Sequence, residues 1–211
     1  FTATETNDVS IVHLQPTQTF IVPHVGRSFE NALAFHQKLF DFKPREKLTV
    51  LLTDFSDAGN ASAEAVPRDF VTLRIAPISF AFETFTASER MSYLMNHELV
   101  HVMTSDRPAP RDRFFRQLFR GKVAPVAEHP ESVPYLYLTA PRRASPRWYL
   151  EGIAVFLDTW MAGGQGRAQG PFDEMVFRSM VIDGTRFPDP LGLASELTKT
   201  DFQVEANSYL Y

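Results

Sequence analysis

The sequence predicts an α+β fold, in which a small N-terminal mixed sheet with one helix packs on a mostly helical C-terminal half. Two observations lead to this prediction. Runs of β-prone apolar residues occur only in the first part of the chain, before residue 76. Apolar residues at helical spacing dominate the part that follows. We expect one domain over residues 1–211, with an α+β lobe at 1–85 and a helical lobe at 86–211.

The elements of the first lobe are expected in the order strand, helix, strand, loop, strand. A strand is predicted over Thr17–Val25, and Ser28 has the character of an N-cap for a helix that ends near Phe40. Apolar residues alternate over Leu48–Leu52, which predicts a second strand. Gly, Asn, Ser and Pro are frequent over Asp57–Arg68, which is typical of a surface loop. A third strand is predicted over Phe70–Ile75, and we expect it to be the edge that pairs with an extended substrate.

Helices dominate the predicted second lobe. Thr86 to Glu89 has the spacing of a capping box, which predicts a helix from there to about Thr104. A short helix is expected over Arg111–Arg120, followed by a proline-rich connection. Ser145 and Pro146 form a favourable helix start, with the helix continuing to about Met161. A glycine-rich loop and two further helices are expected after it, at 163–170, 171–182 and 200–211.

The composition excludes several classes of protein. The net charge of −4 provides no electrostatic reason to expect nucleic acid as a partner. No apolar run approaches the length of a transmembrane segment. The chain has no cysteine, so a metal would have to be bound by His, Asp or Glu. It starts at Phe1 without a leader, which indicates a removed signal segment or an excised piece of a longer protein. We expect an exported protein, periplasmic or extracellular.

The motif His97-Glu98-Leu99-Val100-His101 carries the candidate chemistry. Histidines four residues apart lie on one face of a helix, where both can bind one tetrahedral zinc ion. Glu98 is placed to take a proton from a water on that metal, and zinc lowers the pKa of such a water. The alternative is that these are ordinary histidines of a core helix, each of which would then need a buried partner.

A third metal ligand is expected from a second helix. A metzincin would carry Gly at position 104 and His at position 107, whereas this chain has Thr104 and Arg107. The segment 148–154 supplies Glu151 instead, and the small residue Gly152 allows the two helices to approach closely. The alternative is that Glu151 is a surface residue, but its neighbours in the sequence are apolar.

HELVH at 97–101 followed by WYLEGIA at 148–154 resembles the gluzincin metallopeptidases, of the thermolysin-like and aminopeptidase-N-like superfamily. The long gap between the two motifs is more similar to the bacterial peptidase-MA-like proteins. The resemblance implies a zincin-like catalytic domain with one Zn²⁺ per chain. It implies metal binding by His97, His101 and Glu151, and general-base catalysis by Glu98. The substrate implied is a peptide or a protein.

The same resemblance implies a tyrosine, well after the glutamate ligand, that stabilises the oxyanion. Tyr211 fits the spacing best and Tyr209 is second. On a helix the two point to different sides, so only one can serve. The alternative is that both are packing residues. Family members continue beyond this point, so we expect a further C-terminal domain in a longer protein.

The function expected from the sequence is a zinc-dependent metallopeptidase that hydrolyses peptide bonds. The rival hypothesis is a catalytically silent zincin-like module that binds or organises partners within a larger protein. The presence of Glu98 argues against this rival, because a purely structural zinc site has no use for a base.

Overall fold

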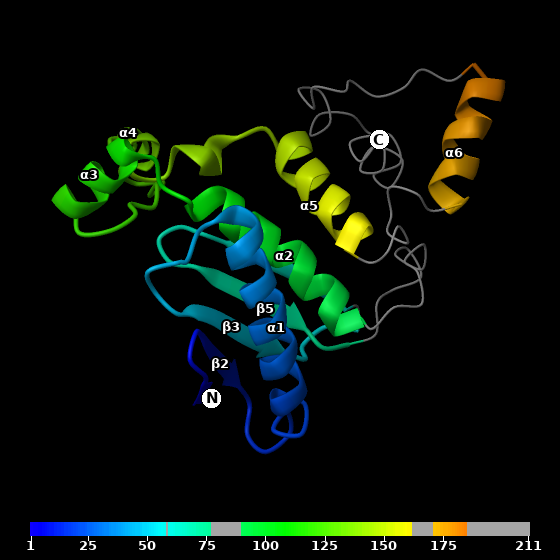
Figure 1. The fold of residues 1–211 in the computed structure, drawn as a ribbon, viewed down its shortest axis with the longest axis horizontal. Coiled ribbons are helices and arrows are strands. Elements are labelled where there is room, and N and C mark those ends of the chain that lie inside the picture. Colours follow the sequence, from blue (N-terminus) through cyan, green and yellow to red (C-terminus); the bar gives the residue numbers. More distant parts are fainter. Residues whose placement is uncertain (58, 77–89, 162–170, 185–211) are drawn as a thin grey trace.

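Five strands form one mixed sheet in the order β1-β2-β3-β5-β4 (Figure 1). The computed structural model describes residues 1–57, 59–76, 90–161 and 171–184. The three central strands run parallel, and β1 and β4 pair antiparallel with their neighbours at the two edges. The combination of a mixed sheet and helices agrees with the predicted α+β class. The strands are β1 (Thr2–Glu5), β2 (Val9–His13), β3 (Leu48–Thr53), β4 (Asn60–Glu64) and β5 (Phe70–Arg74).

Helix α1 (Val22–Phe40) connects the parallel strands β2 and β3 and covers one face of the sheet. Its buried residues recur every three or four positions, with Val25, Phe29 and Leu33 all at most 3% exposed. The helix ends at Asp41, whose left-handed conformation (φ 45°) stops the helical hydrogen-bond ladder. Every second residue of the inner strands is buried in the same core, as Val9 and Ile11 of β2 are.

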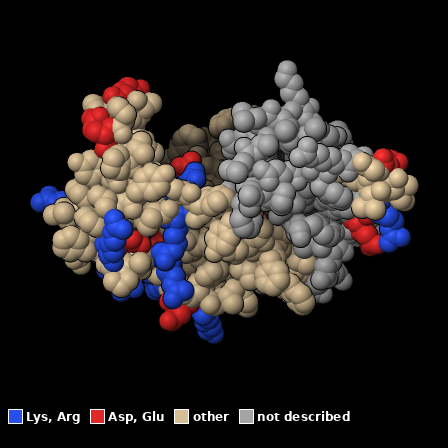
Figure 2. Space-filling view, turned by 90° about the horizontal axis from the view of Figure 1, so that it is seen from above, with Lys and Arg blue, Asp and Glu red and all other residues tan. Residues whose placement is uncertain are grey.

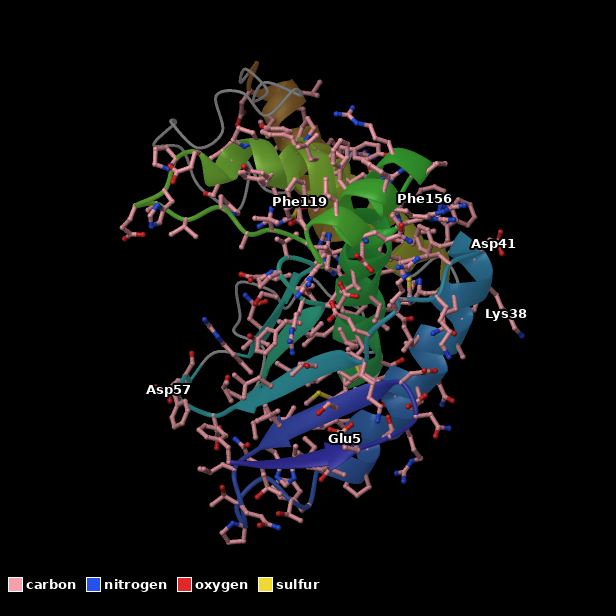
Figure 3. The ribbon with its side chains drawn as sticks, turned by 90° about the vertical axis from the view of Figure 1, so that its left-hand side faces the viewer. Glu5, Lys38, Asp41, Asp57, Phe119 and Phe156 are labelled. Atoms are coloured by element: carbon pink, nitrogen blue, oxygen red, sulfur yellow. The ribbon has the colours of Figure 1, made fainter. Side chains whose placement is uncertain are left out.

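Helix α2 (Arg90–Asp106) lies beside α1 on the same face of the sheet (Figure 3). Its apolar residues are buried around most of its circumference, including Leu99, Val100 and Met103, each 0% exposed. A helix buried in this way has no solvated face on which polar side chains could be accommodated without partners. The polar residues of α2 therefore need partners within the structure.

The regular elements of the described chain after α2 are all helices, and one isolated bridge joins Val126 to His129. Helix α5 packs against α2, whereas α3 and α4 pack against each other to one side (Figure 1). Within the described ranges, no helix has an apolar stretch long enough to span a bilayer. The elements are α3 (Pro110–Leu118), α4 (Ser132–Thr139), the 3₁₀ helix η2 (Pro141–Ala144), α5 (Arg147–Met161) and α6 (Pro171–Ile182).

The strand predicted over Thr17–Val25 is wrong. The chain turns before Ile21, and Val22 begins α1, six residues before the N-cap expected at Ser28. Packing overrides the β propensity of this stretch, because Val22 and Val25 begin the buried stripe of α1. The N-terminal strands are β1 and β2, which the prediction missed because they are short and β1 is largely exposed.

The loop predicted over Asp57–Arg68 contains a strand, β4. Its sequence has little β propensity, and it is a strand because it pairs along its whole length with β5. The strand predicted over Phe70–Ile75 is confirmed as β5, but it is not an edge, since β3 and β4 flank it. The proline-rich connection also holds α4, with Pro134 tolerated in its first turn. The predicted capping box at 86–89, the glycine-rich loop and the last helix lie outside the described residues.

A buried charge cluster ties the sheet to the C-terminal end of α2. The Nζ atom of Lys122 lies 2.7 Å from Asp69 Oδ1, just before β5, and 2.9 Å from Asp106 Oδ1 at the end of α2. The side chains of all three residues are at most 6% exposed. Arg116 also reaches Asp106 Oδ1, at 2.8 Å. Burial raises the pKa of Asp69 to about 7, an effect that the charge of Asp106 reinforces and Lys122 opposes.

We expect the Lys122→Met substitution to lower the free energy of unfolding by about 3–5 kcal/mol, because it leaves Asp69 and Asp106 buried without this cation. Urea denaturation followed by circular dichroism measures the change. The control is Lys43→Met, since Lys43 forms an exposed ion pair with Asp8 at 2.9 Å and should contribute less than about 1 kcal/mol. Equal, small effects of the two substitutions would contradict a structural role for the Lys122 cluster.

Candidate metal centre

Three side chains from two helices converge on one point between α2 and α5. His97 and His101 project from α2 one turn apart, and Glu151 projects from α5. The Nε2 atoms of the two histidines are 3.1 Å apart. Glu151 Oε2 lies 3.4 Å from the Nε2 atom of His97 and 3.6 Å from that of His101. The structure therefore brings together the three residues that the sequence predicted as metal ligands.

These separations fit a tetrahedral metal site. Histidine nitrogen and carboxylate oxygen bind such metals at about 2.0–2.2 Å, so two ligand atoms of a tetrahedron lie about 3.3–3.6 Å apart. The three measured separations, 3.1, 3.4 and 3.6 Å, are close to that range. Only small movements of the side chains are needed to place all three atoms at bonding distance from one ion.

Asp158 determines which ring nitrogen of His97 faces the point where the three side chains converge. The Nδ1 atom of His97 lies 2.9 Å from Asp158 Oδ2, and the Tyr93 hydroxyl donates to the same oxygen at 2.9 Å. A carboxylate accepts hydrogen bonds, so the proton of a neutral His97 sits on Nδ1 and the lone pair on Nε2 faces His101 and Glu151. Converging acceptor atoms repel one another, and a cation removes that repulsion.

The charge state of Glu151 agrees with this arrangement. Burial by itself raises the pKa of a carboxyl group, but the interactions of Glu151 with the His101 and His97 rings outweigh it and hold the Glu151 pKa well below its ordinary value. Glu151 is an anion at neutral pH for this reason. Its side chain is 32% exposed, against 8% for His97, so the centre is reached by solvent from the Glu151 side.

Glu98 follows His97 directly on α2 and is 6% exposed. It is not one of the three residues whose ligand atoms converge, which fits a role other than metal binding. The proposed oxyanion donors Tyr211 and Tyr209 lie outside the described residues, so their role stays a prediction.

The sequence analysis missed Asp158 and Tyr93, although their spacing contained a signal. Tyr93 precedes His97 by one helical turn, and Asp158 follows Glu151 by two turns. Tyr93 therefore lies on the same face of α2 as His97, and Asp158 lies on the same face of α5 as Glu151. Asp158 is 2% exposed on an otherwise apolar stretch of α5, and a buried carboxylate at such a position requires partners.

No protein-family model, no curated protein and no solved structure matches this chain. The interpretation of the centre therefore depends on its own geometry and chemistry.

We expect the Asp158→Asn substitution to weaken the binding of a divalent metal by about 10- to 100-fold, the range found when the partner of a ligating histidine is removed. Competition against a chelating dye, with Zn²⁺ and Co²⁺ as probes, measures the affinity. Asp183→Asn is the control, because Asp183 is exposed after the end of α6. An unchanged affinity in Asp158→Asn would show that this carboxylate does not support the centre.

Proposed function

We propose that this chain is a zinc-dependent metallopeptidase of the gluzincin type, with a zincin-like catalytic domain. The observation that carries the proposal is the convergence of His97, His101 and Glu151 at separations suited to a tetrahedral ion. The presence of buried Glu98 in the same turn of α2 supports hydrolysis rather than a purely structural metal site.

The donor set favours one Zn²⁺ per chain. Two histidines and one carboxylate, without cysteine, are the three protein ligands of many catalytic zinc sites, which keep a fourth position open. When bound, zinc supplies a Lewis acid that polarises a carbonyl group and lowers the pKa of water. Asp158 would hold the His97 ring in position for this purpose, as partners of zinc-binding histidines do.

The proposed catalytic role of Glu98 is proton transfer. Its carboxylate takes a proton from the attacking water, whose oxygen forms a bond with the carbon of the peptide carbonyl. The C–N bond then breaks, and Glu98 passes the proton to the leaving amine. Over the cycle one water is consumed, and Glu98 returns to its initial state.

Strand β4 is the better candidate for pairing with an extended substrate. It is the outer strand beside β5 in the described part of the sheet, and it packs against α2, which carries the histidines. An extended peptide can add to an edge of this kind through main-chain hydrogen bonds. The sequence predicts this role for Phe70–Ile75, but β5 lies between β3 and β4, and β4 is the outer strand.

The substitution Glu98→Gln separates the peptidase from a silent binding or scaffold module. We expect the variant to keep one zinc per chain, because Glu98 is not a ligand, and to lose hydrolysis of a quenched fluorescent peptide library that the unaltered chain cleaves. Elemental analysis and fluorescence measure the two properties. The matched variant Glu151→Gln should lose affinity for zinc as well. Loss of zinc from Glu98→Gln, or its full activity, would contradict the proposed role.

If Tyr211 stabilises the oxyanion, Tyr211→Phe should lower kcat by about 10²- to 10³-fold with little change in KM, the range for loss of one such donor. Tyr209→Phe is the matched control, since only one of the two can serve. A larger loss of kcat in Tyr209→Phe than in Tyr211→Phe would assign the oxyanion role to Tyr209 instead.

A further inference from the structure

A pocket of about 870 Å³ opens at the end of the α2–α5 interface, where α2 ends and α5 begins. The start of α3 and the 3₁₀ helix η2 complete its wall. Apolar side chains form part of the lining, among them Phe40, Met103, Leu150 and Ile153. The pocket does not include the three metal ligands, so it is a separate feature beside the centre.

The charged residues that line this pocket in the described part of the chain are all basic. Arg107, Arg113 and Arg142 contribute to the lining, and no described acidic residue does. Arg142 is held in place because it donates to the carbonyl oxygen of Arg107 and lies 3.6 Å from Asp112 Oδ2. Arg107 and Arg113 are exposed, and neither has an acidic partner among the described residues. In the view of Figure 2, Lys and Arg side chains lie close together, with acidic side chains among them, on the side of the molecule where α3 and α4 lie.

This local excess of positive charge contrasts with the chain as a whole, whose net charge is −4. Arg142 is paired with Asp112, whereas Arg107 and Arg113 bring positive charge to the same concave site without such a partner among the described residues, and an anion in the pocket offsets that charge. The fork of an arginine side chain matches the two oxygens of a carboxylate. The pocket is therefore complementary to a group that combines a carboxylate with an apolar stem.

The pocket begins one turn of helix away from the metal centre. Thr104 lines it, three residues after His101, which corresponds to about 4.5 Å along the axis of α2. On α5, the lining residues Leu150 and Ile153 lie on either side of Glu151 in the sequence. Arg107 is six residues after His101, or about 9 Å. An extended peptide rises about 3.3 Å per residue, so the two distances of about 4.5 and 9 Å correspond to about one to three substrate residues.

We infer that this pocket is a specificity site for an acidic residue of the substrate, located one to three residues from the bond that is cleaved. The inference rests on the proposed function for its connection to cleavage. Arg107 and Arg113 bind the carboxylate, Arg142 completes the basic wall, and the apolar lining contacts the stem of the bound side chain.

Binding of short peptides tests this site without depending on cleavage. The probes are fluorescein-labelled octapeptides in which a single Glu occupies each position in turn of an otherwise uncharged sequence, each paired with its Gln counterpart. Fluorescence anisotropy with the full chain carrying Glu98→Gln keeps the peptides intact. We expect at least one Glu peptide to bind about tenfold more tightly than its Gln counterpart, and this preference to decrease with added salt.

Charge-reversal variants locate the preference. Arg107→Glu and Arg113→Glu should each remove the preference for Glu. Arg111→Glu should keep it, because Arg111 lies on α3 together with Arg113 but does not line the pocket. Circular dichroism shows whether each variant is folded. Equal binding of Glu and Gln peptides at every position, or a preference that survives both reversals in the pocket, would overturn the inference.

Cleavage assays with the unaltered chain distinguish the two proposals. A Glu preference in binding, together with no cleavage of any peptide, would contradict the metallopeptidase and leave the acidic-residue site standing. Cleavage of the peptides without a Glu preference at any position would support the metallopeptidase and overturn the site.

Discussion

The contact between α2 and α5 is the constraint on which the rest of the structure depends. Two helices that are distant in sequence approach closely enough for His97 to share the Asp158 carboxylate with Tyr93. Because this carboxylate is 2% exposed, the hydrogen bonds it accepts must replace the water that it lost on burial. Only when α5 is held at this position can Glu151 reach the point at which the two histidines of α2 meet.

The sheet and α1 provide the rigid support for that contact. They bury α2 against an apolar core, so the direction in which each of its polar side chains points is determined by packing. The Lys122 cluster acts at the C-terminal end of α2, where Lys122 joins Asp106 of the helix to Asp69, just before β5. Two sets of buried polar contacts, one at His97 in the middle of α2 and one at Asp106 at its C-terminal end, thus fix the position of α2 relative to the elements around it.

The same arrangement leaves the centre accessible on one side. Glu151 is the most exposed of the three converging residues, and the arginine-lined pocket lies at the adjacent end of the α2–α5 interface. A polar centre supported from the buried side and open on the other is suited to a reaction with an external substrate. The basic pocket next to it adds a chemical preference that the centre itself does not contain.

The sequence by itself determined the features that depend on neighbours along the chain. The spacing of His97 and His101 sets a common helix face, and the alternation in β3 and β5 follows from residues within each strand. Only the tertiary structure decided that β4 is a strand, that Val22 begins a helix, and that Asp158 supports His97. These features result from contacts between elements far apart in sequence, whose energies outweigh local propensity and leave little trace in the periodicity of one segment.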